Sequence, residues 1–558
     1  MSSSTDLQTP ADAGAEQAGL RPGARIAAPR VFWPSAAIVA VVVALALVVP
    51  EKLGSTLQGL NDTVIGDLGW YYVLIVSGFV LFAAWLVLSP LGDVVLGKDE
   101  DEEPEFGLKS WFAMLFAAGM GIGLVFWGVA EPLNHFAAPP PGTAETEPGA
   151  ARSAMDTTFL HWGLHAWAIY VVVGLALAYA VHRRGRPVSI RWALEPLLGD
   201  RVKGVLGDVI DVIAVVGTLF GVATSLGFGV SQLSAGLTFV GAVDEGSTAL
   251  KVGLIIAITA VAVVSVATGV EKGIKWLSNI NMAMAAVFLA AVAILGPTVF
   301  VMGDFVQQLG SYARNFFDLS FRTLSFQGED GKSWMSAWTI FYWGWWMSWA
   351  PFVGVFIARI SRGRTVREFV TGVLLVPTLV TFLWFSVLGG SALYREMFGA
   401  GGLVGEDGAV STDMALFQLL DGLPMSGLLS VVAMALVIIF FVTSADSGSY
   451  VVGMLATGGD AVPPLWTRVF WAVLSGAIAA ALLVAGAVDG GDGLGALQTM
   501  AILLAAPFSV VMVAMVFSTA TALMREHRMI QRAERRLFAD EVAGHVARTH
   551  AVRTTEDA

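Results

Sequence analysis

The amino-acid sequence predicts an all-α membrane protein with about twelve transmembrane helices. Hydrophobic residues make up 56% of its 558 residues, charged residues make up only 14%, and the mean hydropathy is +0.72. A soluble chain of this length does not have such a composition. Apolar stretches also recur at the length of about 20 residues that one membrane crossing requires. Cysteine is absent, which excludes disulfides and thiolate metal sites.

Twelve apolar stretches are long enough to span a bilayer. They lie near 32–50, 69–92, 108–130, 157–181, 206–240, 248–269, 276–302, 335–358, 369–394, 425–457, 466–488 and 497–524. The fifth and tenth are longer than one crossing needs, which indicates bent or tilted single helices. We expect each of the twelve to cross the bilayer once, the fourth (157–181) as a single helix.

The basic residues predict the orientation of these helices. Lys and Arg gather before the first span and after the fourth, eighth and last spans, which are all tails or even-numbered junctions. By the positive-inside rule both termini are cytoplasmic, and the chain is a multi-pass protein of the cell (inner or plasma) membrane in contact with its lipids. The net charge of −12 is carried by tails and loops, so it does not indicate a nucleic-acid partner.

A polar segment containing four phenylalanines divides the spans into two blocks of five. This segment reads as an amphipathic helix and loop on the outer face. Because each block has an odd number of spans, the second block is inverted relative to the first, as in many transporters. The predicted organisation is a flexible cytoplasmic tail (1–30), two peripheral helices (31–107), a first five-helix block (108–303), the outer helix and loop (304–333), a second block (334–524) and a cytoplasmic tail (525–558).

The eighth span carries four tryptophans within seven positions. On a helix, four of its rings fall within an arc of roughly 100°: Tyr342, Trp345, Trp346 and Trp349. Such a wall of ring faces suits a quaternary ammonium, which has no hydrogen to donate and is held by cation–π attraction. The alternatives are an interfacial aromatic belt or ordinary helix packing. The fourth span adds Trp162, Trp167 and Tyr170, three further rings that could complete a cage.

The third span contains three alternating glycines, Gly119, Gly121 and Gly123. Each glycine inside a helix costs about 1 kcal/mol relative to alanine, so this segment should unwind readily. Unwound backbone within a membrane lines a cavity, where its carbonyls can bind a small cation. The alternative is a helix-packing face of small residues.

The tenth span supplies hydroxyl oxygens, the hard ligands that sodium needs, in Thr443 and Ser444. Interhelical hydrogen bonding is the alternative role for these residues. The spans show no nucleophile–base set, no metal-type His/Glu spacing and no phosphate loop, and Glu131 is read as a single acid without a partner. The sequence therefore predicts that the protein is not an enzyme. A channel is a further alternative, although a closed ring-lined cage suits binding and release better.

Taken together, these motifs resemble those of the betaine/carnitine/choline transporter family, and most closely its sodium-coupled glycine betaine symporters. The resemblance covers about residues 32–524 and includes the sequence Ala358–Arg364 after the eighth span. It implies a LeuT-like 5+5 inverted repeat with two N-terminal helices, a homotrimer and a small zwitterionic substrate. It implies no cofactor, with Na⁺ as the coupling ion.

The resemblance also implies roles for individual residues. The substrate site would comprise Trp162, Trp167, Tyr170, Trp346, Trp345, Trp349, Met120, Gly121, Gly123 and Ser225. The first sodium site would comprise the carbonyls of Ala117, Met120 and Phe440 with the hydroxyls of Thr443 and Ser444. A second sodium site would use Thr218 and Phe352. There the sequence departs from the family pattern, because Val222 stands where a second threonine would be and offers no ligand.

The expected function is sodium-coupled uptake of a quaternary-ammonium or sulfonium zwitterion, such as glycine betaine, by alternating access. Choline-type members tend to have an acid at the position of Gly123, so the glycine favours a zwitterion. Carnitine-type exchangers carry a basic side chain in the fifth span, and Val205–Val240 has none. The alternative function is sodium-independent substrate/product exchange of the carnitine type. The sequence leaves the choice of solute and the sodium stoichiometry open.

Overall fold

The computed structural model describes residues 28–119, 121–143, 146–268, 271–487 and 493–556. Within these ranges the regular structure is helical, with two isolated β-bridges in loops. All but the last three residues of the expected tail at 1–30 lie outside the described residues.

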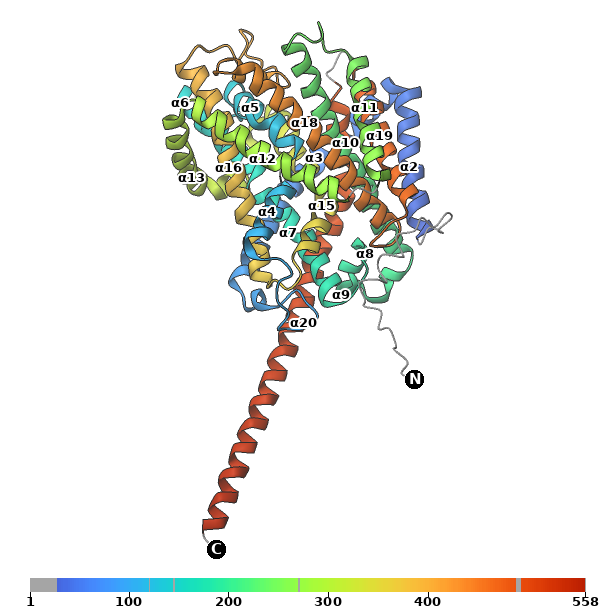
Figure 1. The fold of residues 1–558 in the computed structure, drawn as a ribbon, viewed down its shortest axis with the longest axis vertical. Helices are drawn as coiled ribbons and strands as arrows, with labels where there is room; N and C mark the ends of the chain where they lie inside the picture. Colours follow the sequence, from blue (N-terminus) through green and yellow to red (C-terminus); the bar gives the residue numbers. More distant parts are fainter. Residues whose placement is uncertain (1–27, 120, 144–145, 269–270, 488–492, 557–558) are drawn as a thin grey trace, which may run out of the picture.

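The long helices form a bundle, shown in Figure 1. In chain order they are α2 (Pro29–Val48), α3 (Pro50–Leu88), α4 (Leu108–Gly119), α5 (Ile122–Ala137), α6 (Glu147–Trp162), α7 (Leu164–Ala178), α10 (Val205–Phe239), α11 (Thr248–Thr268), α12 (Glu271–Leu295), α13 (Thr298–Ser320), α15 (Phe341–Ile360), α16 (Val366–Phe398), α18 (Ser426–Ala456), α19 (Leu465–Ala487) and α20 (Gly495–Glu556). Short helices join them: η2 (Pro90–Asp93), η3 (Tyr179–Arg183), α8 (Ile190–Ala193), α9 (Glu195–Leu198), η4 (Gly199–Lys203), η5 (Ser325–Gln327), α14 (Gly328–Met335), η6 (Ser336–Ile340) and α17 (Ala415–Asp421).

Ten helical segments in the described part of the chain are long and apolar enough to cross a membrane. The chain is therefore a multi-pass, all-helical membrane protein. Two of the twelve expected spans are not among the ten. The third is divided into the shorter α4 and α5. The eighth is the 20-residue α15, which has indole and phenol rings at many positions where other spans have aliphatic side chains.

The glycine-rich part of the third span is interrupted, as expected. α4 ends at Gly119, α5 begins at Ile122, and Gly121 between them has an extended backbone (φ −146°, ψ −177°). Met120 lies outside the described residues. The interruption places the N-terminus of α5 in the interior of the bundle, beside α15 and α16.

The fourth span is also divided, which differs from the single helix expected over 157–181. α6 ends at Trp162 and α7 begins at Leu164, with Gly163 between them at φ −95° and ψ −135°. A Cβ at Gly163 would lie 2.5 Å from the carbonyl oxygen of Phe159 and 2.7 Å from the Phe382 ring. The close approach of α16 thus fixes the break, and only glycine fits there.

The break frees carbonyls at the end of α6, and side chains from other helices satisfy them. Trp346 Nε1 donates to the carbonyl of His161 at 2.8 Å, and Thr381 Oγ1 donates to the carbonyl of Trp162 at 3.2 Å. The interrupted helix is therefore connected directly to α15 and α16. These contacts hold the end of α6 beside the aromatic face of α15.

α15 occupies the centre of the bundle and packs against α7, α10 and α20 (Figure 1). α5 packs against α16, and α10 packs against α18. At the C-terminus α20 continues without a break through residue 525, the expected start of the tail, and extends well beyond the bundle in Figure 1.

At the end of the bundle where α15 finishes, two loops pair with each other. The Leu96 amide donates to the Arg364 carbonyl at 2.8 Å, and the Arg362 side chain lies 2.5 Å from Glu102. The amide of Lys98 also donates to Glu102 at 2.7 Å. The hydrogen bond from this backbone N–H, with the nearby Arg362 guanidinium, lowers the pKa of Glu102 below its ordinary value of 4.5.

Candidate substrate-binding site

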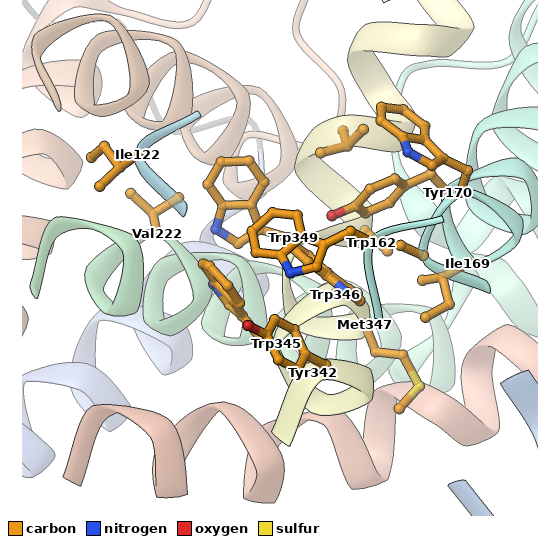
Figure 2. Close-up of a cluster of buried hydrophobic side chains, with 14 of the residues drawn as sticks. Ile122, Trp162, Ile169, Tyr170, Val222, Tyr342, Trp345, Trp346, Met347 and Trp349 are labelled. Atoms are coloured by element: carbon orange, nitrogen blue, oxygen red, sulfur yellow. The ribbon is translucent and has the colours of Figure 1, made fainter. Parts of the chain in front are cut away.

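A pocket lies where α5, α6, α7, α10, α15 and α16 meet. Its lining residues are Gly121, Gly123, Leu124, Trp162, Ala166, Trp167, Tyr170, Ser225, Trp345, Trp346, Trp349 and Thr381. Figure 2 shows rings from α6, α7 and α15 gathered together, whereas Met347 points away on the other side of α15. The two divided helices thus bring their ends to one buried chamber.

The rings of the pocket contact one another edge to face and by stacking. Trp162 meets Trp346 edge to face, with ring centroids 4.9 Å apart, and Tyr170 meets Trp346 at 6.3 Å. Trp345 stacks on Trp346 at 4.5 Å. These side chains are between 1% and 6% exposed. Ring faces and edges from three helices therefore enclose a small apolar space, the arrangement that a cation without hydrogen-bond donors requires.

The structure brings nine of the ten expected substrate-site residues into this one pocket. The tenth, Met120, lies outside the described residues. Ser225 lies there with its hydroxyl donating to the Gly221 carbonyl at 3.4 Å. Sequence reasoning missed Leu124, Ala166 and Thr381, which carry no chemical signature in the sequence.

The glycine at 123 is required by the packing of two indoles. A Cβ at Gly123 would lie 2.6 Å from Cη2 of Trp345 and 3.0 Å from Cη2 of Trp162. At Gly121, by contrast, a Cβ would meet only Trp349, at 3.8 Å. Gly123 therefore sets how closely the rings approach the N-terminus of α5, independently of the helix break.

Two of the indole N–H groups in the pocket wall have no acceptor. Nε1 of Trp345 and Nε1 of Trp349 are buried and have no hydrogen-bond partner among the described residues. The N-terminus of α5, at Gly121 and Ile122, carries the positive end of its helix dipole at the same pocket. The chamber thus offers ring faces for a cation and the positive end of a helix dipole for an anion, which matches the two ends of a zwitterion.

Glu131 is a functional candidate that sequence reasoning missed. The expectation that it has no partner is wrong. Its side chain is fully buried and is within hydrogen-bonding distance of Trp162, Tyr342, His161 and His135. The signal in the sequence was an acid within an apolar span, a feature that is costly and usually functional.

A second pocket lies beside the first, and Trp349 lines both. Its lining residues are Ser278, Asn281, Met282, Trp349, Phe352, Val353, Phe356, Phe440, Thr443, Ser444 and Ser447. Trp349 lines both pockets and packs so closely on Gly221 that a Cβ there would lie 2.7 Å from its ring. Trp349 therefore forms part of the wall between the two pockets.

Three of the expected sodium ligands, Phe440, Thr443 and Ser444, line this second pocket. The Thr443 hydroxyl donates to the carbonyls of Ile439 at 2.8 Å and Phe440 at 3.2 Å, so its lone pairs remain available to a cation. Ala117 lies in the last turn of α4, directly before the interruption.

Thr218 and Phe352, the residues of the expected second sodium site, have different surroundings from each other. The Thr218 hydroxyl is buried and donates to the Ala214 carbonyl of its own helix at 2.7 Å. Phe352 lines the second pocket. Val222 is buried against α18, where a Cβ at Gly448 would lie 3.3 Å from it. Val222 therefore fills the space beside α18 with methyl groups.

Comparison with known proteins identifies the family. The model of the betaine/carnitine/choline family transporters matches residues 30–528. The chain belongs to this family. The glycine betaine transporter OpuD of Bacillus subtilis is 45% identical over 505 residues, which cover 90% of this chain and 96% of that protein. Glycine betaine transporter 1 of Vibrio parahaemolyticus is 44% identical, covering 89% and 94%.

An uncharacterized transporter of Mycobacterium tuberculosis is more similar, at 52% identity over 488 residues, which cover 87% of this chain and 81% of that protein. As a member of the betaine/carnitine/choline transporter family, the chain is a membrane transporter and not an enzyme.

Proposed function

We propose that this protein is a sodium-coupled symporter that takes up a quaternary-ammonium zwitterion such as glycine betaine by alternating access. The observation that carries the proposal is the pocket in which indole and phenol rings surround a small space that the N-terminus of α5 also lines. Relatives at 42–45% identity are named glycine betaine transporters, which supports the same substrate.

The two ends of the substrate would contact different parts of the pocket. Trp162, Trp167, Tyr170 and Trp346 would hold the trimethylammonium group, each ring contributing about 0.5–2 kcal/mol. The carboxylate would accept from Trp345 or Trp349 and face the N-terminus of α5. A dimethylsulfonium head fits the same rings, because cation–π attraction needs only a desolvated positive charge.

Sodium would be held by the hydroxyls of Thr443 and Ser444 and the carbonyls of Ala117, Met120 and Phe440. This set joins the divided α4–α5 to α18, so a bound ion would favour the conformation that binds substrate. Thr218 and Phe352 would serve a second ion, although Val222 supplies no oxygen. The absence of Lys and Arg from Val205–Phe239 favours sodium over a built-in cationic side chain.

The proposal includes the expected architecture and placement in the membrane. The twelve spans would form two peripheral helices and a LeuT-like 5+5 inverted repeat over 108–303 and 334–524, joined by the outer segment at 304–333. Both termini would be cytoplasmic in the cell membrane, and three copies would associate. The second pocket would then lie on the cytoplasmic side of Trp349.

Uptake of radiolabelled betaine into proteoliposomes tests the function. We expect accumulation with an inward sodium gradient and little without it, because the coupling ion supplies the driving force. Equal uptake under both conditions would refute sodium coupling. Counterflow that persists in sodium-free buffer would instead identify a substrate/product exchanger. A thermal-shift panel of betaine, dimethylsulfoniopropionate, ectoine, proline betaine and carnitine then identifies the preferred solute.

A further inference from the structure

Glu131 lies directly behind the aromatic pocket, at the centre of a buried hydrogen-bond network. Its Oε2 accepts from Trp162 Nε1 at 2.5 Å and from the Tyr342 hydroxyl. Its Oε1 lies 2.7 Å from His161 Nδ1 and 3.3 Å from His135 Nε2. Its side chain and both histidines have no solvent exposure, so these protein groups replace water around the carboxyl group.

The network reaches two rings of the cage. Trp162, which donates to Glu131, is itself part of the pocket wall. His161 also lies next to the pocket through its backbone, because its carbonyl accepts from Trp346 Nε1 at 2.8 Å. Tyr342 packs behind both indoles, with ring centroids 5.6 Å from Trp162 and 5.9 Å from Trp346. Moving Glu131 would therefore release Trp162 and disturb the support behind Trp346.

The contact between Glu131 and Trp162 also has an electrostatic effect on the indole ring. An indole N–H can only donate, so Oε2 of Glu131 acts as an acceptor towards Trp162. A hydrogen bond to a carboxylate is stronger than one to a neutral group, and bonds in a low-dielectric interior polarise one another. A neutral carboxyl oxygen can accept the same bond, but when Glu131 is ionised its negative charge on the N–H edge of Trp162 pushes electron density into the ring. The ring face then attracts a cation more strongly, since cation–π binding depends on the ring quadrupole.

We propose that Glu131 is a positioning residue that holds Trp162 in the cage and, through its negative charge, strengthens the attraction of that ring for the onium group of the substrate. The inference rests on the proposed function, because it assumes an onium substrate in the pocket. Glu131 would contribute to specificity without touching the substrate, and its effect would pass through a single indole.

A double-mutant cycle tests this route. Betaine dissociation constants are measured by isothermal titration on the full-length protein, for Glu131→Gln, Trp162→Leu and the double variant. We expect Glu131→Gln to raise the betaine Kd between about 2-fold and 30-fold, the range for one cation–π contact. In the Trp162→Leu background the same substitution should change Kd less than about twofold, because the residue acts through Trp162.

Asp156→Asn is the matched control. Asp156 is a buried acid of α6 that accepts from Ser311 and Asn315 and does not line the pocket. We expect it to leave the betaine Kd within about twofold in both backgrounds, as distant sites are usually independent. If Glu131→Gln does not fold, Glu131→Asp replaces it in the double-mutant cycle, because the shorter side chain of aspartate moves the carboxylate away from Nε1 of Trp162.

The charge of Glu131 is tested separately with 3,3-dimethylbutyrate, in which carbon replaces the betaine nitrogen. Glu131→Gln should weaken betaine binding more than binding of this uncharged-head analogue. Equal weakening of both would overturn the electrostatic part of the proposal. If Glu131→Gln changes the betaine Kd equally with and without Trp162, or does not change it at all, Glu131 does not act through Trp162 and the proposal is overturned. Failure of the wild-type protein to bind betaine would instead refute the proposed function.

Discussion

Substituting Gly123 by alanine should weaken substrate binding while leaving the fold intact. The added Cβ would lie 2.6 Å from Cη2 of Trp345, and relief to an ordinary contact of about 3.4 Å requires the ring to move about 0.8 Å. Trp345 cannot move freely, because it stacks between Phe341 and Trp346 and meets Phe228 edge to face at 5.1 Å. The displacement would therefore pass to Trp346 and deform the cage.

The magnitude follows from two opposing effects. Overpacking of this kind costs about 1–3 kcal/mol, whereas alanine in the first turn of α5 recovers up to about 1 kcal/mol of helix propensity. Thermal stability should therefore change little. If the overpacking is relieved by deforming the cage, the betaine Kd should rise by about 5-fold to 150-fold.

Isothermal titration with betaine, alongside thermal unfolding, measures both quantities. Gly217→Ala is the control: Gly217 is a buried glycine of α10 with no atom within 4 Å of an added Cβ, and it does not line the pocket. Its Kd should match that of the wild type. Betaine binding by Gly123→Ala within twofold of the control would refute the reasoning that this glycine sets the ring positions.

Three further predictions concern the cage, the ion and the paired loops. Trp346→Leu should raise the betaine Kd about 2-fold to 30-fold, because it removes one ring of the cage. Trp343→Leu removes a ring outside the pocket and should leave the Kd unchanged. Equal effects of the two substitutions in titration would contradict the cage. Thr443→Ala should raise the sodium concentration needed for half-maximal betaine binding but leave the betaine Kd at saturating sodium unchanged. An unchanged sodium titration would show that this hydroxyl is not a sodium ligand. Because the folded state lowers the pKa of Glu102, its stabilising effect is present above pH 4.5 and is lost as the pH falls through the lowered value. Thermal unfolding of Glu102→Gln between pH 7 and pH 4 should therefore show a smaller loss of stability than the wild type, and parallel curves would contradict that contribution.

The membrane fold and most of the aromatic pocket could be predicted from local sequence. Apolar length determines which segments span, and the spacing of rings on α15 determines which side chains share a face. The interruption after Gly119 was predictable because alternating glycines weaken a helix locally. The sequence around Gly163 carries no such signal, since that break depends on the approach of Phe382 from α16.

The network around Glu131 could not be predicted for the same physical reason. Its donors come from α5, α6 and α15, and those from α6 and α15 are 30 or more residues away in the chain. Local spacing shows only the pair formed with His135, one helical turn later. The acid in an apolar span indicated a function, and only the packing of the three helices showed that it supports the cage.

A cryo-electron microscopy structure with betaine and sodium tests the central claim most directly. We expect density for the trimethylammonium group between the rings of Trp162, Tyr170 and Trp346, with the carboxylate towards Trp345 or Trp349. Density confined to the second pocket, on the far side of Trp349, or an aromatic pocket that stays empty at saturating betaine, would contradict it.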